Sequence, residues 1–519
     1  MPTNLNIGIL GHVDSGKTTL AKALSAIAST SAFDKSPQSV ERGITLDLGF
    51  SALRINLPEH LKNDNDVKDE QLLQYTFVDC PGHASLIRTI IGGSQIIDLM
   101  ILVVDITKGI QTQTAECIVI GQIIKKKILV VLNKIDQLDE EKKDQTIEKM
   151  TKRIKASLVK LGIESPPVVA ISATTEENLP NLIAVIAEMS FIPIRNPEKP
   201  FLFAVDHCFN VRRGQGSICT GTVLQGSVKV GDEVEIAQLK ISRKVKSIEM
   251  FKNPVREAKQ GDRIGISITQ FDVKSMERGF ICHPGLVVQA TCAVLKLSKV
   301  SFYRSAIRSN SKFHITAGHE TTLATITLFS GDCKDFSFDS EYMFLDEVSA
   351  ATETDPDHIF LLLTFERAIS VVPGILIIGS KLDLDVATTT CRLAFFGNLL
   401  EVTDDKGYTS SFLPKLKIYK EKTKRGTIQR MVCDTELITG NLLKAGNREA
   451  FLRMTVHLTS GEIGKIESTF GQTSKVKLKF AQNLSPETIS SLKEKPSSVS
   501  VELRYKKFLF HRDKKIILQ

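Results

Sequence analysis

The chain has 519 residues, of which 42% are apolar and 24% are charged, and this length is too great for a single hydrophobic core. We therefore expect a multidomain globular protein. No stretch approaches the roughly 18 consecutive apolar residues of a membrane-spanning helix, and the first residues resemble neither a signal peptide nor a transit peptide. These observations argue against a membrane-spanning or secreted protein and predict a cytoplasmic one.

The net charge of +8 is distributed unevenly along the chain. Residues 401–519 carry a charge of about +10, so residues 1–400 carry about −2. A basic surface in one part of the chain suggests a polyanionic partner, because neutralisation of phosphates by lysine and arginine dominates nucleic-acid affinity. The alternative is a lysine-rich surface that is only solvated.

Short apolar runs alternate with helical patterns from residue 4 to about residue 190. The runs are NIGIL, YTFVDC, LMILVVDI, KILVVLNKID and PPVVAISA, and patterns such as KTTLAKALSAIAST lie between them. Such alternation of buried strands with crossover helices is typical of a parallel α/β sheet. Pro193, Pro197 and Pro200 then interrupt the chain, because proline cannot continue a helix. We place the first domain at residues 1–196.

Beyond these prolines the pattern changes to short β-rich runs separated by glycine turns, such as GSICTGTVL, KVKSIEMF and GDRIGISI. Regular short strands with frequent turn signals predict barrels. We expect a second domain at residues 197–287, a third at residues 288–400 and a basic β-rich barrel at residues 401–519. The predicted fold class is therefore multidomain, with one α/β domain followed by all-β domains.

The segment GHVDSGKT, residues 11–18, matches the phosphate-binding pattern GxxxxGK[ST]. It directly follows the strand NIGIL and precedes the helical pattern TTLAKALSAI, which is the context that such a loop requires. Backbone N–H groups of this loop point at the β- and γ-phosphates of a nucleotide, Lys17 adds a positive charge, and the hydroxyl of Thr18 ligates Mg²⁺. The first domain is therefore predicted to be a P-loop domain.

Two further motifs complete the predicted nucleotide site. In YTFVDCPGH, Asp79 ends an apolar strand, where its carboxylate can reach the Mg²⁺ through water, and Gly82 lies where the backbone approaches the γ-phosphate. In NKID, Asp136 can accept both N–H donors of a guanine edge, and the backbone at Ser172-Ala173 can donate to the guanine O6. Either of these two signals is weak alone, but their order behind a P-loop indicates GTP or GDP. The predicted GTP-binding residues are Gly11, His12, Val13, Asp14, Ser15, Gly16, Lys17, Thr18, Thr19, Asp79, Gly82, Asn133, Lys134, Asp136, Ser172 and Ala173.

GHVDSGKT, ERGITLDLGF, DCPGH and NKID resemble the phosphate loop, first switch, second switch and base-recognition motif of translational GTPases of the elongation factor Tu class. The resemblance implies that Thr45 binds Mg²⁺ when GTP orders the first switch, and that His83 orients the attacking water. Phosphoryl transfer needs mainly positioning and charge stabilisation, which a histidine beside Gly82 can supply, although a packing histidine is the alternative. The predicted catalytic residues are Lys17, Thr45 and His83, and the predicted Mg²⁺ ligands are Thr18, Thr45 and Asp79.

The same resemblance implies that Asp14 helps to hold a monovalent cation near the phosphates, although it could simply brace the loop. No arginine finger stands in a recognisable place in the sequence. Hydrolysis by the chain alone is therefore expected to be slow, and the ribosome is the expected activator.

The stretches GITLDLGF, DCPGHASLIRTIIGG, KFHITAGHET and RLAFFG resemble the archaeal and eukaryotic type of selenocysteine-specific elongation factor, and the likeness covers nearly the whole chain. It implies a GTPase that binds selenocysteyl-tRNA, delivers it to the ribosome at recoded UGA codons and acts with a protein that binds the mRNA recoding element. It also implies a selenocysteine pocket formed by Asp206, His207 and Arg263. A selenol is anionic at neutral pH whereas serine is neutral, so a cationic pocket can discriminate between them. An ordinary charged turn around Arg263 is the alternative.

The basic C-terminal part contains LKIYKEKTKRGTIQR and RYKKFLFHRDKK, in which aromatic residues alternate with basic ones. Such a surface can stack on and neutralise RNA, although the alternation also fits a barrel strand with one buried face. The resemblance assigns this domain to the long variable arm of the selenocysteine tRNA. The predicted RNA contacts are Lys415, Lys417, Lys420, Lys422, Lys424 and Arg425.

Two other functions remain open on the sequence alone. An initiation GTPase subunit that carries initiator tRNA has a similar architecture but typically contains zinc-type cysteine pairs. The nine cysteines here have no CxxC spacing and are expected to be reduced core thiols. The second alternative is a GTP-regulated ribosome-binding or RNA-binding protein that never carries aminoacyl-tRNA. In each case we expect a monomer that uses GTP or GDP with Mg²⁺.

Overall fold

The structure is a computed structural model, and the chain forms two compact units in it. One unit consists of residues 1–326 and 363–404, and the other consists of residues 327–362 and 405–519. The predicted domain boundaries at residues 196, 287 and 400 stay a prediction. None of the described helices is long and apolar enough to cross a membrane. The structure describes residues 3–25, 27–28, 48–62, 72–81, 96–160, 162–163, 166–210, 217–269, 276, 278–318, 320–349, 355–383, 391–443, 449–470, 474–510 and 517–518.

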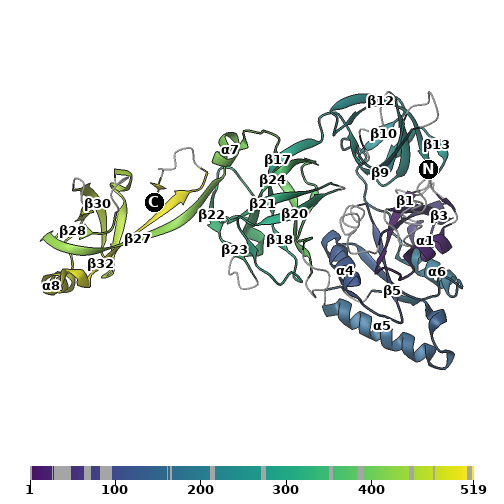
Figure 1. Ribbon diagram of the computed structural model, residues 1–519, viewed down its shortest axis with the longest axis horizontal. Helices are drawn as coiled ribbons and strands as arrows, with labels where there is room; N and C mark the ends of the chain where they lie inside the picture. The colour runs from purple at the N-terminus through teal and green to yellow at the C-terminus, as the bar shows by residue number, and fades with distance from the viewer. Residues whose placement is uncertain are drawn as a thin grey trace. The chain divides into compact units, whose positions relative to one another are not determined.

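A sheet forms the centre of the N-terminal part, where Figure 1 labels β1, β3 and β5. It has seven strands in the order β2, β3, β4, β1, β5, β6, β7. The strands β4, β1, β5, β6 and β7 are parallel to one another, as the alternating pattern predicts, whereas β3 pairs antiparallel with β4, and β2 pairs antiparallel with β3 at the edge. β3 and β4 thus form an antiparallel hairpin directly before DCPGH. The strands are β1 (Thr3–Gly11), β2 (Ile27–Ala28), β3 (Gly49–Asn56), β4 (Leu72–Asp79), β5 (Leu99–Asp105), β6 (Lys127–Asn133) and β7 (Val168–Ala170).

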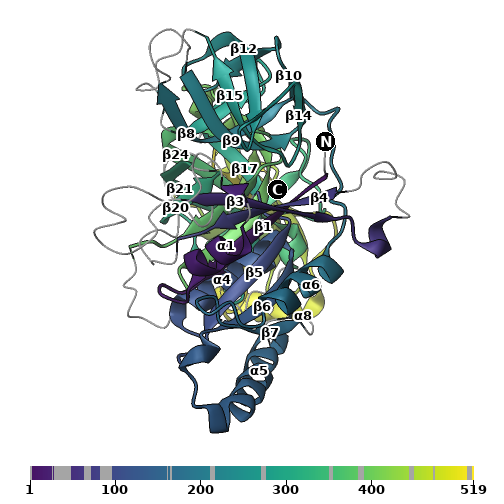
Figure 2. The ribbon, with the colours of Figure 1, turned by 90° about the vertical axis from the view of Figure 1, so that its right-hand side faces the viewer.

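Helices lie around this sheet and bury its central strands (Figure 2). Leu20 of α1 and Leu182 of α6 join one apolar cluster with alternate strand residues such as Ile101. Helix α4 packs close to Met100, the residue before Ile101 in β5. A Cβ on Gly121 of this helix would lie 2.9 Å from the sulfur of Met100. Since successive strand residues face opposite sides, helices cover both faces, which explains the continuous apolar runs. The helices are α1 (Lys17–Leu24), α4 (Thr112–Ile124), α5 (Lys143–Lys160) and α6 (Leu179–Met189).

The second domain is a barrel, as the sequence predicts. The strands β11, β16, β8, β9, β15 and β12 pair in this order, and the pairing of β11 with β12 closes the sheet. Alternate residues such as Phe203, Ile236 and Ile266 fill its interior. The strands are β8 (Leu202–Asn210), β9 (Ser217–Gln225), β10 (Ser227–Lys229), β11 (Glu233–Ile236), β12 (Ile241–Met250), β13 (Asn253–Val255), β14 (Glu257–Lys259), β15 (Arg263–Ile268) and β16 (Gly279–Cys282).

A further barrel follows, in which β20, β25, β26, β17, β24 and β21 pair in order and β20 also pairs with β21. Phe313 and Phe395 contact each other edge to face in it, with ring centroids 5.2 Å apart. We refer to it as the third barrel, because it forms the third domain of the chain. Its strands are β17 (Val288–Lys296), β18 (Ser298–Lys299), β19 (Ile307–Arg308), β20 (Lys312–Ala317), β21 (Glu320–Ser330), β24 (Ile359–Val371), β25 (Leu376–Ser380) and β26 (Leu393–Thr403).

The C-terminal part contains another closed barrel, with the order β27, β28, β31, β30, β29, β32 and a closing pair between β27 and β32. Helix α8 contributes Leu492 to its apolar core, and Ser485 caps that helix by accepting the N–H of Thr488. The remaining elements of this unit are β22 (Glu341–Leu345), β23 (Glu347–Val348), α7 (Tyr408–Ser411), β27 (Lys417–Cys433), β28 (Glu436–Gly440), β29 (Thr455–Leu458), β30 (Ile463–Thr469), β31 (Val476–Phe480), α8 (Pro486–Glu494), β32 (Ser500–Phe508) and β33 (Ile517–Leu518). The predicted fold class is confirmed.

A buried polar network joins the first domain to the barrel of the second domain, which we call the second barrel. Asn4 and Asn6 each donate a side-chain hydrogen bond to the carbonyl oxygen of Gly261, at 2.7 and 2.9 Å. Arg195 forms an ion pair with Asp98 within the first domain at the same junction, and a Cβ on Gly261 would lie 2.6 Å from the guanidinium of Arg195. Gly261 also has φ of +93°, so this turn requires glycine for both space and conformation. The network fixes the start of β15 relative to the sheet.

A second polar link joins α4 to the third barrel. Arg392 and Glu116 form two parallel hydrogen bonds, each 2.8 Å long, and the two residues are 4% and 8% exposed. Such a bidentate pair is geometrically specific. The nucleotide-binding domain is therefore tied to both barrels of its compact unit.

Candidate functional site

The predicted phosphate-binding loop joins β1 to α1. Gly16, the residue before α1, has φ of +89°, a left-handed conformation that favours glycine. A Cβ at Gly16 would lie 2.2 Å from Nδ2 of Asn133, so the loop also needs glycine for space. That amide donates a hydrogen bond of 2.9 Å to the carbonyl oxygen of Ser15. The loop is thus held against the end of β6.

Lys17 points back across this loop. Its ammonium donates a 2.6 Å hydrogen bond to the carbonyl oxygen of His12, and the residue is only 6% exposed. Burial lowers the pKa of Lys17 because desolvation disfavours the charged form, and the carboxylate of Asp79 opposes this effect only in part. A phosphate beside the ammonium would supply the missing negative charge, which is the predicted role of this lysine.

Two of the three predicted Mg²⁺ ligands lie together. The hydroxyl of Thr18 donates a 2.6 Å hydrogen bond to Oδ2 of Asp79, which is 1% exposed at the end of β4. Hydroxyl and carboxylate oxygens are the donors that hard divalent cations prefer, so the pair fits a Mg²⁺ ion. The third predicted ligand, Thr45, lies outside the described residues, as do Gly82 and His83.

Asn133 connects the two ends of the predicted nucleotide site. Besides its bond to the phosphate-binding loop, its Oδ1 accepts the N–H of Ala173 at 2.9 Å, and the residue is 2% exposed. Lys134, in a left-handed conformation with φ of +71°, pairs with Asp105 at 2.8 Å. Asp136, the predicted guanine acceptor, lies two residues after Lys134 and is exposed. The structure therefore makes Asn133 a brace and leaves Asp136 accessible to a base.

Motif reading missed two residues that support this site. Burial alone would raise the pKa of Asp105, but hydrogen bonds from Lys134 and Thr107 outweigh it and hold this pKa below its ordinary value. Gln113 on α4 accepts the N–H of Val13 at 3.2 Å and steadies the phosphate-binding loop. Asp105 is the last residue of the apolar strand β5, which is the same signal that identified Asp79 at the end of β4.

Ser172 also has a local role in the structure. It is completely buried, and its hydroxyl accepts the N–H of Thr175 at 3.2 Å. The side chain of Ser172 therefore closes the turn that contains Ala173.

The three residues of the predicted selenocysteine pocket lie near one another on β8 and β15. Arg263 and Asp206 form a buried ion pair and are 4% and 3% exposed. The guanidinium also stacks on the ring of Phe50, 3.4 Å from its centroid. Its other terminal nitrogen, Nη2, is buried and has no hydrogen-bond acceptor among the described residues. His207 follows Asp206 directly and is half-buried.

The predicted RNA-contact residues lie on or next to β27. The ammonium of Lys420 lies 3.5 Å from the ring centroid of Phe344 and 3.4 Å from a carboxylate oxygen of Asp346. Lys424 lies 4.5 Å from the ring centroid of Phe451. Both lysines are therefore partly engaged within the protein, in agreement with the alternative that one face of the strand is buried.

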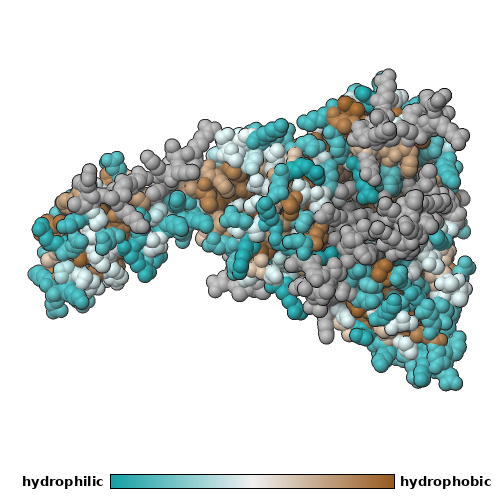
Figure 3. Space-filling view, in the orientation of Figure 1, coloured by the Kyte–Doolittle hydropathy of each residue, from teal (hydrophilic) through white to brown (hydrophobic). Residues whose placement is uncertain are grey.

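The other predicted contacts are more accessible. Lys415 and Lys422 are exposed. Lys417 donates to a backbone carbonyl oxygen at 3.0 Å, and Arg425 pairs with Glu502 at 3.2 Å. Figure 3 shows hydrophilic residues over much of the visible face of this barrel. An anionic partner would therefore compete with some internal contacts of these side chains.

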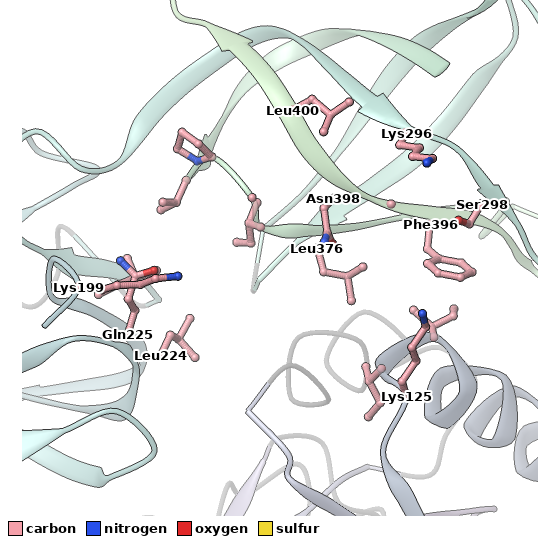
Figure 4. Close-up of a pocket in the computed structure, with 18 of the residues that line it drawn as sticks. Lys125, Lys199, Leu224, Gln225, Lys296, Ser298, Leu376, Phe396, Asn398 and Leu400 are labelled. Carbon is pink, nitrogen blue, oxygen red and sulfur yellow. The ribbon is translucent and has the colours of Figure 1, made fainter. Parts of the chain in front are cut away.

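A cavity of about 750 Å³ lies where the first domain meets the second and third barrels (Figure 4). Lys125 and Lys126 from the end of α4, Lys199 before β8 and Lys296 from β17 line it. In Figure 4, Lys125 extends towards Phe396 of β26. Lysines gathered from three domains give this junction a positive potential. None of the predicted site residues that the structure describes lines the cavity. Its lysines come from distant parts of the sequence, so no contiguous motif could have identified it.

Four family models match successive parts of the chain. The elongation factor Tu GTP-binding domain matches residues 2–191, and elongation factor Tu domain 2 matches residues 216–283. The third domain of the eukaryotic selenocysteine-specific elongation factor matches residues 294–397, and the eEFSec C-terminal RIFT domain matches residues 414–514. The order of these matches agrees with the order of the domains in the fold.

Known proteins resemble the chain over most of its length. A selenocysteine-specific elongation factor of Mus musculus is 45% identical over 93% of this chain and 89% of the mouse protein. A selenocysteine-specific elongation factor of Methanocaldococcus jannaschii is 34% identical over 77% of this chain and 80% of that protein. The crystal structure of translation elongation factor SelB from Methanococcus maripaludis, in complex with the GTP analogue GppNHp, covers 98% of this chain and 99% of the archaeal one. It is 26% identical, with a TM-score of 0.71.

The phosphate-binding loop, its guanine-recognition end and the barrel that follows define a GTPase of the elongation factor Tu class, which binds GTP and functions in translation. The extent of the likeness then narrows the assignment. The chain belongs to the selenocysteine-specific elongation factor family. Membership in this family excludes the alternative of an initiation GTPase subunit. It also confirms the resemblance seen in the sequence.

Proposed function

We propose that this chain, in its GTP-bound state, binds selenocysteyl-tRNA and delivers it to the ribosome at recoded UGA codons. Hydrolysis of GTP to GDP and phosphate on the ribosome then releases the cargo. The observation that carries the proposal is the buried guanidinium of Arg263, whose Nη2 has no acceptor among the described residues. A buried donor without a partner is costly, and an anionic selenolate would satisfy it.

The geometry also suggests how selenocysteine is distinguished from serine. Arg263 uses Nη1 for its ion pair with Asp206, so the pair holds the guanidinium in place while Nη2 remains for the ligand. A seryl hydroxyl can accept a hydrogen bond there, but it brings no negative charge. His207, next to Asp206 in the chain, is the second cationic or donor group of the proposed pocket. The stacked ring of Phe50 would form one wall of the pocket, because it covers the guanidinium.

For the hydrolysis step we propose Lys17, Thr45 and His83 as catalytic residues. A Mg²⁺ ion held by Thr18, Thr45 and Asp79 would neutralise charge on the β- and γ-phosphates. The protein supplies the ammonium of Lys17 and the loop that Asn133 and Gln113 brace. Asp14 is exposed in this loop with φ of +59°, and we propose that it helps to hold a monovalent cation.

We further propose that the C-terminal barrel binds the variable arm of the tRNA. β27 and β32 pair so that Lys420 lies directly opposite Lys507. Like charges in register destabilise a strand pair, and an RNA phosphate between them would relieve the repulsion. Lys415, Lys417, Lys422, Lys424 and Arg425 extend this basic surface. A protein bound to the mRNA recoding element, a monomeric state and a cytoplasmic location complete the proposal.

The proposal is tested by the affinity of the GTP-loaded protein for selenocysteyl-tRNA and, at the same salt concentration, for the same tRNA charged with serine. The wild type should prefer the selenocysteyl form, and Arg263→Ala should abolish the preference. Lys246→Ala, an exposed substitution on β12 of the same barrel, is the matched control and should change nothing. Equal binding of the two tRNAs by the wild type would refute the pocket. Failure to bind either tRNA would favour a GTP-regulated RNA-binding protein that carries no aminoacyl-tRNA.

A further inference from the structure

Two cysteines of the second barrel face each other across neighbouring strands. Cys208 of β8 lies directly opposite Cys219 of β9 in the antiparallel register, and their sulfur atoms are 3.3 Å apart. Both side chains belong to the apolar interior of the barrel, where Cys219 is completely buried and Cys208 is partly exposed. A disulfide needs sulfur atoms about 2.05 Å apart, so the two sulfur atoms have only a short distance to close.

The other cysteines provide a useful contrast. Cys333 and Cys433 are exposed, so the expectation that all nine cysteines are core thiols is wrong for these two. The hydroxyl of Thr435 lies 3.4 Å from the sulfur of Cys433. Among the described residues, the pair in the second barrel is the one for which the structure gives a sulfur-to-sulfur contact. The pair therefore combines proximity with access from one side.

The two thiols also differ in chemical character. The hydrogen bond from Cys208 and burial raise the pKa of Cys219, so its thiol stays protonated at neutral pH. Cys208 is the more exposed of the two residues, so we expect it to react with an oxidant first. Once Cys208 carries a mixed disulfide, Cys219 is already next to it, and proximity compensates for the small thiolate fraction.

We propose that Cys208 and Cys219 form a modification site that low-molecular-weight disulfides such as glutathione disulfide oxidise to an intramolecular disulfide. Cys208 gives up its proton, attacks the glutathione disulfide and releases one glutathione. Cys219 then gives up its proton, attacks the sulfur of Cys208 and releases the second glutathione. In total the protein loses two protons and two electrons, and the glutathione disulfide is reduced to two glutathione molecules.

The site lies beside the proposed cargo pocket, so its oxidation reaches that pocket. Cys208 follows His207 directly, and the register of β8 against β9 shifts between Val205 and His207, around Asp206. Drawing Cys208 towards Cys219 moves the strand at the point that carries these two pocket residues. Oxidation therefore weakens the preference for selenocysteyl-tRNA over seryl-tRNA, and this second step rests on the proposed function.

The thiol chemistry is tested first, without tRNA. The full chain is equilibrated in glutathione buffers of increasing oxidised fraction, free thiols are blocked with a maleimide, and the protein is digested with trypsin. Because Arg212 and Arg213 lie between the two cysteines, a disulfide would join the peptides 196–212 and 214–229. We expect this linked pair in the wild type and its loss after reduction with dithiothreitol. Wild-type protein that carries only glutathione adducts, with no linked peptides, would overturn the inference.

Matched variants separate the pair from general thiol reactivity. Cys219→Ala should keep a glutathione adduct on Cys208 but form no linked peptide. Cys333→Ser removes an exposed thiol elsewhere and should leave the linked peptide unchanged. Linked peptides that involve Cys333 or Cys433 in place of the proposed pair would also overturn the inference.

The cargo step is tested with the oxidised and reduced wild type and with Cys208→Ala. The oxidised wild type should lose its preference for selenocysteyl-tRNA and regain it on reduction, whereas Cys208→Ala should keep the preference under both conditions. An oxidised wild type with an unchanged preference overturns the coupling to the pocket. A reduced wild type without any preference instead refutes the proposed function, and the peptide assay still decides the thiol chemistry.

Discussion

Replacement of Glu116 by alanine should weaken the junction between the nucleotide-binding domain and the third barrel. Glu116 lies on α4, and Arg392 lies directly before β26. Their two hydrogen bonds are both 2.8 Å long, and both residues are at least nine-tenths buried. The substitution would leave the guanidinium buried with two donors that have lost their acceptors.

The magnitude follows from this burial. Removal of one partner of a buried ion pair costs about 3–5 kcal/mol, because the remaining charge stays desolvated and loses the carboxylate that it was paired with. Replacement of both partners by apolar residues of similar volume, as in Glu116→Leu with Arg392→Met, is often neutral or stabilising. The double variant should therefore recover most of the stability that Glu116→Ala loses.

The free energy of unfolding is measured by urea titration, with circular dichroism as the signal because the chain contains no tryptophan. Glu148 and Lys152 form an ion pair on α5 in which both side chains are largely exposed, so Glu148→Ala is the control and should cause no measurable change. A loss below about 1 kcal/mol for Glu116→Ala would show that the buried pair behaves like a solvated one and would refute the reasoning.

Four further outcomes are expected. Gly16→Ala should lower the affinity for fluorescent GDP at least about tenfold, because it adds left-handed strain and displaces Asn133; unchanged affinity would contradict the loop geometry. Burial raises the pKa of Asp262 to about 6, above its ordinary 3.8, so the folded state is penalised above pH 6 and the penalty fades as the pH falls towards 3.8. Since each pKa unit corresponds to about 1.36 kcal/mol, Asp262→Asn should raise stability by about 3 kcal/mol at pH 7.5 and by nothing well below pH 3.8, as pH-dependent thermal melts can check. Ser485→Ala should cost the C-terminal barrel about 1 kcal/mol in urea titration, since it removes the cap of α8. Lys422→Ala should lower the slope of log affinity for tRNA against log salt by about one, and an unchanged slope would exclude a phosphate contact.

The nucleotide-binding loop and the order of the domains could be predicted from the sequence because their determinants are local. A strand, a glycine-rich loop and a helix follow one another within residues 5–24, and each has its own pattern. The barrels were likewise predicted from short strands separated by glycine turns, since a strand that buries one face must pair with its neighbours. The family resemblance was carried by contiguous motifs for the same reason.

The roles of individual side chains depended on contacts between residues that are far apart in the chain. Asn133 is predicted from NKID to bind the nucleotide, and the structure adds that its side-chain amide joins the phosphate-binding loop to the turn at Ala173. Arg263 is predicted from the sequence to line a cationic pocket with Asp206 and His207, but the sequence does not show what contacts it. In the structure it is buried between Asp206 and Phe50, and Phe50 comes from a different domain.

The class of fold, the guanine-nucleotide motifs and the family could all be predicted from the sequence, because they depend on runs of neighbouring residues. Which polar groups are buried, and what each one contacts, could be seen only in the folded chain. It paired Cys208 with Cys219 through strand register, Glu116 with Arg392 through packing of α4, and Gly261 with Asn4 through a domain junction. The physical reason is that burial and strand register arise from the whole folded chain. A one-residue shift in the register of a strand, for example, would turn its side chains to the opposite face.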